Sequence, residues 1–459
     1  MNDWLDAETR AERAMQLSES RQWQQALAEL DAAIAINPHD VHWHIQRGNI
    51  LDELERYEEA VEAYETALAM DDESAEVATF LGMDLIRVGR HEDAVRLFEG
   101  LAARQVDYEP AYCNQIAAYT RIGDHEKAEE MFYVAQQLEP DCPHCFHHLA
   151  ESLACRGQFD RALFCWQRVL DIAPDYPNVQ RRIAQVHRVQ GDRAKAREAY
   201  LEALRADPGN CDLLADLGDL MIEMGDLEAA AAKFSYLLDL EPDHTRGNVM
   251  LGLIELRNGR HASAVERFEF VLAVEPDYPG LRTYLGEAEY CRANIAGAVE
   301  HLKAAIEQDP RDTVALVAMG NCHLKARRLD DAEDYYRKAL AVRPDVVAAL
   351  HNLAVCRFLA DDLEKGVRYC RRALRHDPAN VMVMYKLALA QMEQGHWAEA
   401  GDFVRRGLSL DPEHAGMNYL ARHTRRLKLR WYVGRVLHLD RRLLHLVVNA
   451  CRTVTPAPA

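Results

Sequence analysis

The stretch GDRAKAREAYLEALRADPGN, residues 191–210, holds four markers that recur along the chain. Gly191 opens it, the small Ala196 and the aromatic Tyr200 follow at helical spacing, and Pro208 stands near its end. A proline cannot donate a backbone hydrogen bond and disfavours a helical residue before it, so Pro208 predicts the end of a helix. Prolines separated by 34 residues or a multiple of 34 are Pro38, Pro140, Pro174, Pro208, Pro242, Pro276, Pro310, Pro344, Pro378 and Pro412.

This spacing divides the chain into twelve repeats with one register, in which the proline is position 32. The repeats begin at Ala7, Val41, Ala75, Glu109, Pro143, Pro177, Cys211, Thr245, Pro279, Thr313, Val347 and Val381. Position 20 is alanine in every repeat except the eleventh, where it is Gly366, and position 8 is glycine or alanine in every repeat except the fourth. Position 24 is aromatic in most repeats, and position 15 is glycine in seven. Small residues at positions 8 and 20 and a bulky residue at position 24 predict two helices in close contact. The glycine at position 15, between them in sequence, predicts that the two helices are antiparallel and joined by a left-handed residue.

The pattern resembles that of the tetratricopeptide repeat family, a 34-residue helix-turn-helix with small, aromatic and proline markers. The resemblance covers about residues 7–414 and implies an all-α, right-handed α-solenoid, or superhelix. The expected organisation is a lead-in at residues 1–6, twelve repeats at 7–414, and a basic C-terminal capping or amphipathic helical segment with a short disordered end at 415–459. Departures are local: Arg21 and Glu55 replace the turn glycine. Gly366 and Cys370 weaken the eleventh repeat.

Composition narrows the class of protein further. The 459 residues include 54 Lys and Arg against 74 Asp and Glu, so the formal net charge is −20 and nucleic acid is not expected as a ligand. The N-terminus lacks a basic stretch followed by an apolar one, and most of the eleven cysteines fall within apolar helical patterns. These features predict a soluble protein of the reducing cytoplasm.

No motif for catalysis or for binding a phosphate or dinucleotide is present. The chain lacks GxxxxGK[ST], HExxH, GxSxG and GxGxxG, so we expect no enzyme activity, no cofactor and no small-molecule substrate. One constellation stands apart: Cys142-Pro143-His144-Cys145, followed by His147, His148 and Glu151, with Cys113 in the preceding repeat. Its residues are compatible with a redox pair, with a metal site at Cys142, His144, His147 and Glu151, or with a peptide contact. They are also compatible with no functional role, since Pro143 has the ordinary structural use of proline at the first helical position. Pro177 and Pro279 are expected to begin helices in the same way.

The family resemblance implies a concave groove lined by positions 2, 5, 9, 12 and 13 of each first helix. In the sixth and eighth repeats these positions predict a basic surface, formed by Asn178, Arg181, Gln185, Arg188, Arg246 and Arg257. One interpretation is a site for an extended acidic peptide, because arginine binds carboxylates through two parallel hydrogen bonds. The alternative is that these arginines pair with Asp212, Asp219 and Glu223 of the seventh repeat.

In repeats ten to twelve the predicted groove is apolar. Its candidate residues are Val314, Val317, Leu324, Val355, Phe358, Leu359, Met382, Tyr385, Leu389 and Met392. Such a stripe predicts either a binding groove or a surface that the protein covers itself. Asn321 and Asn352 match asparagines that hold the ligand backbone in peptide-binding relatives, and Lys386 lies at position 6 of the next repeat; Asn49 is an isolated match.

The segment after Pro412 is basic, with nine Lys or Arg and one Asp in residues 415–459. Residues 415–427 predict a capping helix, and residues 428–452 an amphipathic one that packs on the last repeats, lies on an anionic membrane, or docks to an acidic partner or nucleic acid. The sequence thus favours a non-enzymatic scaffold or adaptor that binds extended or helical protein segments in its groove. Alternatives are a peripheral membrane or secretion-assembly adaptor, and an accessory subunit of a transferase, because the 47 residues after Pro412 are too few for a catalytic domain.

Overall fold

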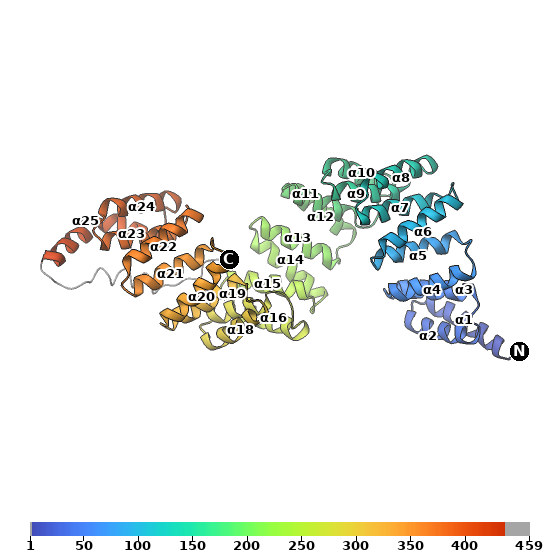
Figure 1. Ribbon diagram of the computed structural model, residues 1–459, viewed down its shortest axis with the longest axis horizontal. Coiled ribbons are helices and arrows are strands. Elements are labelled where there is room, and N and C mark those ends of the chain that lie inside the picture. Colours follow the sequence, from blue (N-terminus) through green and yellow to red (C-terminus); the bar gives the residue numbers. More distant parts are fainter. Residues whose placement is uncertain (1, 437–459) are drawn as a thin grey trace. The chain divides into compact units, whose positions relative to one another are not determined.

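The computed structural model describes residues 2–436, with side chains for residues 6–429 and for Trp431. All regular secondary structure in this range is α-helical, and consecutive helices form antiparallel pairs (Figure 1). The chain divides into two compact bodies, Met1–Leu220 and Met221–Ala459.

The N-terminal body contains the first six repeats. Its helices are α1 (Asn2–Glu19), α2 (Trp23–Ile36), α3 (Val41–Glu53), α4 (Tyr57–Met70), α5 (Ala75–Arg87), α6 (His91–Arg104), α7 (Glu109–Ile122), α8 (His125–Leu138), α9 (Pro143–Cys155), α10 (Phe159–Ile172), α11 (Val179–Val189) and α12 (Arg193–Ala206), with most of α13 (Cys211–Glu223). Helix α1 begins at Asn2 and therefore includes residues 2–6 of the predicted lead-in.

The C-terminal body continues the same alternation of helices. They are α14 (Leu227–Leu240), α15 (Thr245–Arg257), α16 (His261–Val274), α17 (Leu281–Cys291), α18 (Ile295–Gln308), α19 (Thr313–Lys325), α20 (Leu329–Val342), α21 (Val347–Leu359), α22 (Leu363–His376), α23 (Val381–Glu393), α24 (Trp397–Leu410) and α25 (Ala415–Val436).

Several hairpins are held together by the bulky residue of the second helix, which packs on the small residue of the first. A Cβ atom built on Gly48 would lie 2.4 Å from the Tyr64 ring, and one on Gly82 only 2.2 Å from the Phe98 ring. Tyr64 and Phe98 are fully buried, and burying such a side chain contributes about 1.5–3 kcal/mol. The predicted contact between positions 8 and 24 is confirmed, because a larger residue at position 8 would displace the ring.

The turn between the two helices has the same backbone conformation in every repeat. Position 15 has a positive φ throughout, at Arg21, Glu55, Gly89, Gly123, Gly157, Gly191, Gly225, Gly259, Ala293, Arg327, Asp361 and Gly395. At Glu55, where φ is 59°, the next amide, Arg56 N–H, donates to the Leu51 carbonyl at 2.9 Å and closes the helix end. Arg21 and Glu55 therefore keep the turn of the glycine repeats, at the conformational cost that a side chain adds in this region.

Two of the three expected helix-initiating prolines are not in helices. Helix α9 begins at Pro143, as predicted, but α11 and α17 begin two residues after Pro177 and Pro279. The residues after these prolines, Asn178 and Gly280, have φ values of 64° and 76°. Proline followed by a left-handed Asn or Gly favours a turn over a helix start, so the prediction for Pro177 and Pro279 is wrong.

The last helix, α25, is continuous from Ala415 to Val436 and packs against α23 and α24. Met417, Leu420 and Leu427 are buried in this contact, and Trp431 Nε1 donates to the Glu393 carbonyl at 2.9 Å. Most of the predicted amphipathic segment, residues 437–452, lies outside the described residues. Among the helices that are described, none combines the length and apolar character needed to cross a bilayer.

Candidate peptide-binding site

The arginine row predicted in the sixth repeat lies on α11, where its first member is already paired. Arg181 Nε donates to Asp216 Oδ2 at 2.8 Å, and Arg181 Nη1 donates to Asp212 Oδ2 at 2.9 Å. Gln185 and Arg188 follow on α11 and are half-buried, whereas Asn178 is exposed at the N-cap and is not part of the helix. The pairing of Arg181 with the next repeat follows the alternative in which these charges interact with each other.

The two arginines predicted for the eighth repeat lie on α15 of the C-terminal body. Arg246 is half-buried near the start of the helix, and Arg257 is exposed at its last residue. Eleven residues, or about three helical turns, separate them, so they do not form one compact anion site.

The apolar residues predicted to line a groove in repeats ten to twelve are mostly core residues. One hydrophobic cluster of the C-terminal body contains, or is packed against by, Val317, Leu324, Val355, Phe358, Leu359, Tyr385, Leu389 and Met392, whereas Val314 is exposed and Met382 is half-buried outside the cluster. The buried members of the prediction are Val317, Leu324, Val355, Phe358, Leu389 and Met392, whereas Tyr385 is half-buried. At these six positions the arrangement follows the alternative of a surface that the protein covers itself, because neighbouring helices cover the side chains.

Phe358 shows the physical reason most directly. An ideal Cβ atom on Gly366 would lie 2.2 Å from Phe358 Cε1, so the ring occupies the space that the other repeats give to an alanine side chain. Position 24 of the same repeat is Cys370, which is smaller than the usual aromatic residue. The two small residues leave room inside the hairpin, and Phe358 turns inward from its predicted groove position to fill it.

The predicted clamp residues interact with one another or lie in the core. Tyr336 OH donates to Asn321 Oδ1 at 2.8 Å, and Asn352 Nδ2 donates to the same oxygen at 2.7 Å. Lys386 is only 2% exposed, with Nζ 5.8 Å from the centre of the Tyr385 ring. Burial, and secondarily the Lys386 charge, lower the pKa of His351 to about 4. These contacts hold the side chains in place without a ligand.

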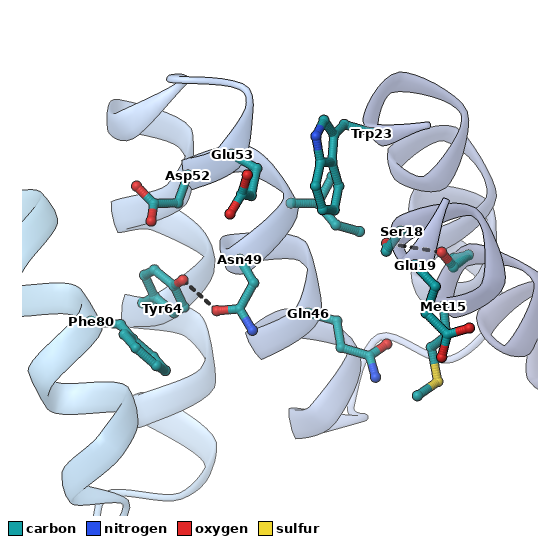
Figure 2. A pocket seen from close by; sticks show the side chains of 12 residues that line it. Met15, Ser18, Glu19, Trp23, Gln46, Asn49, Asp52, Glu53, Tyr64 and Phe80 are labelled. Carbon is teal, nitrogen blue, oxygen red and sulfur yellow. Dashed lines mark hydrogen bonds between the residues drawn. The ribbon is translucent and has the colours of Figure 1, made fainter. Parts of the chain in front are cut away.

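A pocket of about 490 Å³ lies in the first three repeats, and we call it the N-terminal pocket (Figure 2). Helices α1 and α3 provide most of its wall, and α2, α4 and α5 contribute one aromatic residue each. The lining residues are Ala14, Met15, Ser18, Glu19, Trp23, Gln46, Asn49, Ile50, Asp52, Glu53, Tyr64 and Phe80. Six of them, Met15, Ser18, Glu19, Asn49, Asp52 and Glu53, occupy positions 9, 12 and 13, which are groove positions in the register above.

The polar groups of the N-terminal pocket have a defined arrangement. Tyr64 OH donates to Asn49 Oδ1 at 2.7 Å, which leaves the Asn49 nitrogen pointing away from Tyr64 (Figure 2). Burial, followed by the charge of Asp84, raises the pKa of Tyr64, so its hydroxyl remains a donor at neutral pH. Asp52 pairs with Arg87, whereas the carboxylates of Glu19 and Glu53 are exposed at the pocket rim.

Sequence reasoning identified only Asn49 in this pocket. A signal that could have found it is the pair formed by Asn at position 9 and Tyr at position 24, which occurs in repeats two and ten as Asn49–Tyr64 and Asn321–Tyr336. The repeats that follow these two have different residues at position 6. Asn352 occupies this position after repeat ten and hydrogen-bonds to Asn321, whereas Phe80 occupies it after repeat two and lines the pocket.

The candidate metal residues separate into two groups. His147, His148 and Glu151 form one group, in which His147 Nε2 lies 3.8 Å from Glu151 Oε1. His144 instead contacts Tyr176, with its Nδ1 2.8 Å from the Tyr176 hydroxyl. Cys113 and Cys142 belong to the second group, together with Glu109 and Cys145.

Comparisons with known proteins agree with the fold. Two family profiles described as tetratricopeptide repeat match the chain, one over residues 17–83 and 292–355, the other over residues 149–210, 215–266, 249–313 and 361–415. No curated protein matches the chain.

Solved structures with similar helix arrangements include three of interest. A tetratricopeptide repeat protein from Parabacteroides merdae is 17% identical, with 51% of this chain and 93% of that chain covered and a TM-score of 0.45. A chain of the APC/C hetero-tetramer Cut9–Hcn1 is 12% identical over 91% of this chain and 95% of that chain, with a TM-score of 0.47. YrrB, described as a TPR protein with an unusual peptide-binding site, is 20% identical over 41% of this chain and 96% of that chain, with a TM-score of 0.33.

Paired helices in tandem define the class as an all-α repeat protein. Because the matched ranges cover more than half of the chain, it belongs to the tetratricopeptide repeat family. Proteins of this family generally take part in protein–protein interactions and are typically not enzymes.

Proposed function

We propose that the protein is a non-enzymatic scaffold that binds a peptide segment of a partner protein in the N-terminal pocket. The observation that carries the proposal is the Asn49 amide, which a tyrosine orients inside a hollow of about 490 Å³. Pockets that bind ligands typically have volumes of about 300–1,000 Å³ and combine apolar walls with a few directed polar groups. The N-terminal pocket has both properties.

The lining residues indicate the chemistry of the peptide. Trp23 and Phe80 offer aromatic surface to an apolar side chain, and the Asn49 nitrogen can donate to a backbone carbonyl of an extended segment. Glu19 and Glu53 place carboxylates at the rim, which favours a lysine or arginine next to the apolar residue. The expected ligand is therefore an apolar residue flanked by a basic one. Arg181, the candidate for an acidic peptide, is held by two carboxylates and is not part of this site.

The test is selection of peptides from a random display library on the immobilised full-length protein, followed by affinity measurements in solution. We expect the selected peptides to carry an apolar residue next to Lys or Arg. Asn49→Ala should weaken binding about 5- to 10-fold, the effect of losing one hydrogen bond of about 1–1.5 kcal/mol. Glu53→Lys should weaken it further, because the substitution reverses a charge at the rim.

The matched control is Glu58→Lys, a charge reversal at an exposed residue of α4 that does not line the pocket. Its affinity should equal that of the unsubstituted protein. Selected peptides that are acidic, or that bind the Asn49→Ala and Glu53→Lys variants with unchanged affinity, would show that the N-terminal pocket is not the binding site.

A further inference from the structure

Three thiols and one carboxylate meet between the fourth and fifth repeats, away from the N-terminal pocket. One ligand-type atom from each of Glu109, Cys113, Cys142 and Cys145 lies within 4.8 Å of the others. Cys145 Sγ donates to Glu109 Oε1 at 2.9 Å. The three cysteines are buried, with at most 5% of each residue exposed, and Glu109 is half-buried. We call these four residues the thiol cluster.

Two helices of the N-terminal body bring the thiol cluster together in pairs. Glu109 and Cys113 lie one turn apart on α7, so both side chains project from the same face. Cys142 is the N-cap of α9, and Cys145 is the third residue of that helix. Since all four are fixed by helical backbone or by a helix start, the cluster is preorganised.

Other repeats show that the contact between positions 5 and 34 is a regular feature of the array. At the corresponding positions Thr283 Oγ1 donates to Asp312 Oδ2 at 2.7 Å, and the hydroxyls of Thr79 and Tyr108 lie 3.3 Å apart. Asp312 also caps the next helix by accepting from two backbone amides. Cys142 makes no such capping bond. Its sulfur therefore belongs to the cluster and has no role in starting α9.

The proximity and burial of the four groups indicate that a positive charge would be accommodated there. Burial raises the pKa of Glu109 to about 7. The pKa values of Cys113 and Cys145 are raised by hydrogen bonds within the cluster and by burial. The pKa of Cys142 is lowered by hydrogen bonding within the cluster, with the Cys113 thiol as the first contributor. Because the four ligand atoms lie within 4.8 Å of one another, the groups would repel one another as anions, and a bound cation would offset that repulsion.

We propose that Glu109, Cys113, Cys142 and Cys145 bind one divalent cation of the zinc class that joins the fourth repeat to the fifth. A tetrahedral zinc site has Zn–S distances of about 2.3 Å and Zn–O distances of about 2.0–2.2 Å, which place its ligand atoms about 3.5–3.8 Å apart. In the thiol cluster all four ligand atoms lie within 4.8 Å of one another, so small side-chain shifts would bring them to these separations. Three sulfur ligands favour zinc over magnesium or calcium, and four protein ligands fill the coordination sphere, as in a structural site.

The experiment uses the full-length protein, reduced, incubated with zinc chloride and dialysed. Metal analysis should find about one zinc per chain, because the cluster supplies one complete ligand set. Cys142→Ser and Glu109→Gln should each lower this occupancy at least 10-fold after dialysis against a weak chelator. Cys155→Ser is the matched control, since Cys155 is an exposed free cysteine of α9 outside the cluster, and it should retain zinc.

A second measurement uses unsubstituted protein only, so it does not depend on how the variants fold. Bound metal should protect Cys113, Cys142 and Cys145 from alkylation, and cobalt-loaded protein should show thiolate-to-metal charge-transfer absorption. Absence of zinc and of the cobalt band in the unsubstituted protein would overturn the proposal. Unchanged zinc occupancy in folded Cys142→Ser would do so too, as would a disulfide among these cysteines in the native protein.

Discussion

Replacing Gly366 with alanine should destabilise the eleventh repeat, and the same replacement should stabilise it once Phe358 has been truncated. Gly366 lies inside α22, where alanine is favoured over glycine by about 1 kcal/mol. The new Cβ atom would, however, lie 2.2 Å from Phe358 Cε1, in a fully buried core. The sign of the effect therefore depends on whether the Phe358 ring is present.

The magnitude follows from these two opposing contributions. Carbon atoms in contact are about 3.5–4.0 Å apart, so the ring would have to move by about 1.5 Å. Overpacking of this kind costs about 1–3 kcal/mol, which leaves Gly366→Ala destabilising by up to about 2 kcal/mol. Phe358→Ala alone should cost about 3–5 kcal/mol, and adding Gly366→Ala to it should recover about 1 kcal/mol. The interaction energy between the two positions is then about 1–3 kcal/mol.

Native-state hydrogen exchange of the α21 and α22 amides is the appropriate assay, because long repeat arrays do not unfold in one step. The control is Gly401→Ala in α24, where an added Cβ would contact nothing within 4 Å. This control should show only the gain of about 1 kcal/mol. If Gly366→Ala stabilised the repeat as much as Gly401→Ala does, the inward packing of Phe358 would be refuted.

Three further predictions concern the turns, a buried histidine and an ion pair. Asp361→Gly should stabilise its turn by about 1 kcal/mol and Gly225→Ala should destabilise its own turn by a similar amount, since both positions have positive φ. Hydrogen-exchange protection at the flanking helix ends would contradict this if it changed in the same direction in both variants. The pKa of His351 is lowered to about 4, so the folded protein keeps this imidazole neutral. The associated stability should be present above about pH 6.5 and be lost as the pH falls from there through 4, by up to about 3 kcal/mol. A His351→Gln variant with the same pH dependence would exclude His351 as its origin. Arg181→Ala should lower the free energy of unfolding by about 2 kcal/mol, because it leaves the buried Asp216 carboxylate without this partner. In denaturant unfolding, the double variant Arg181→Ala with Asp216→Ala should recover part of that loss.

The hairpins could be predicted because steric contacts within a single repeat determine which residue type recurs at each position. Gly82 is small because Phe98 lies against it, and position 15 is left-handed whether it holds glycine or, as at Glu55, another residue. Pro177 was misplaced because proline fits both the first residue of a helix and the turn before it. The Asn178 that follows is the residue that distinguishes the two, since it tolerates positive φ.

The binding surface was harder to predict because exposure at a groove position depends on residues elsewhere in the hairpin. Two repeats with different residues at position 12 show this. In the second repeat Asp52 lines a pocket, whereas in the eleventh Phe358 is buried in the space left by the missing side chain of Gly366 on the second helix. The Arg181 pairs depend on contacts between repeats, which the register suggests but does not decide. The same register also places Cys113 next to Cys142, a contact that the spacing of adjacent repeats could have indicated before the structure.

The repeated Asn–Tyr pair has a consequence for how such an array can evolve new binding sites. The tyrosine orients the amide in both copies, Asn49 and Asn321, so the recognition element is inherited with the repeat. The surroundings of the amide differ at one neighbouring side chain: Asn352 packs against Asn321 and donates to its oxygen, whereas Phe80 leaves Asn49 bordering a hollow. A single codon change at such a neighbour could therefore expose or mask a ready-made contact point, and duplicated repeats could diversify their ligands without rebuilding the scaffold.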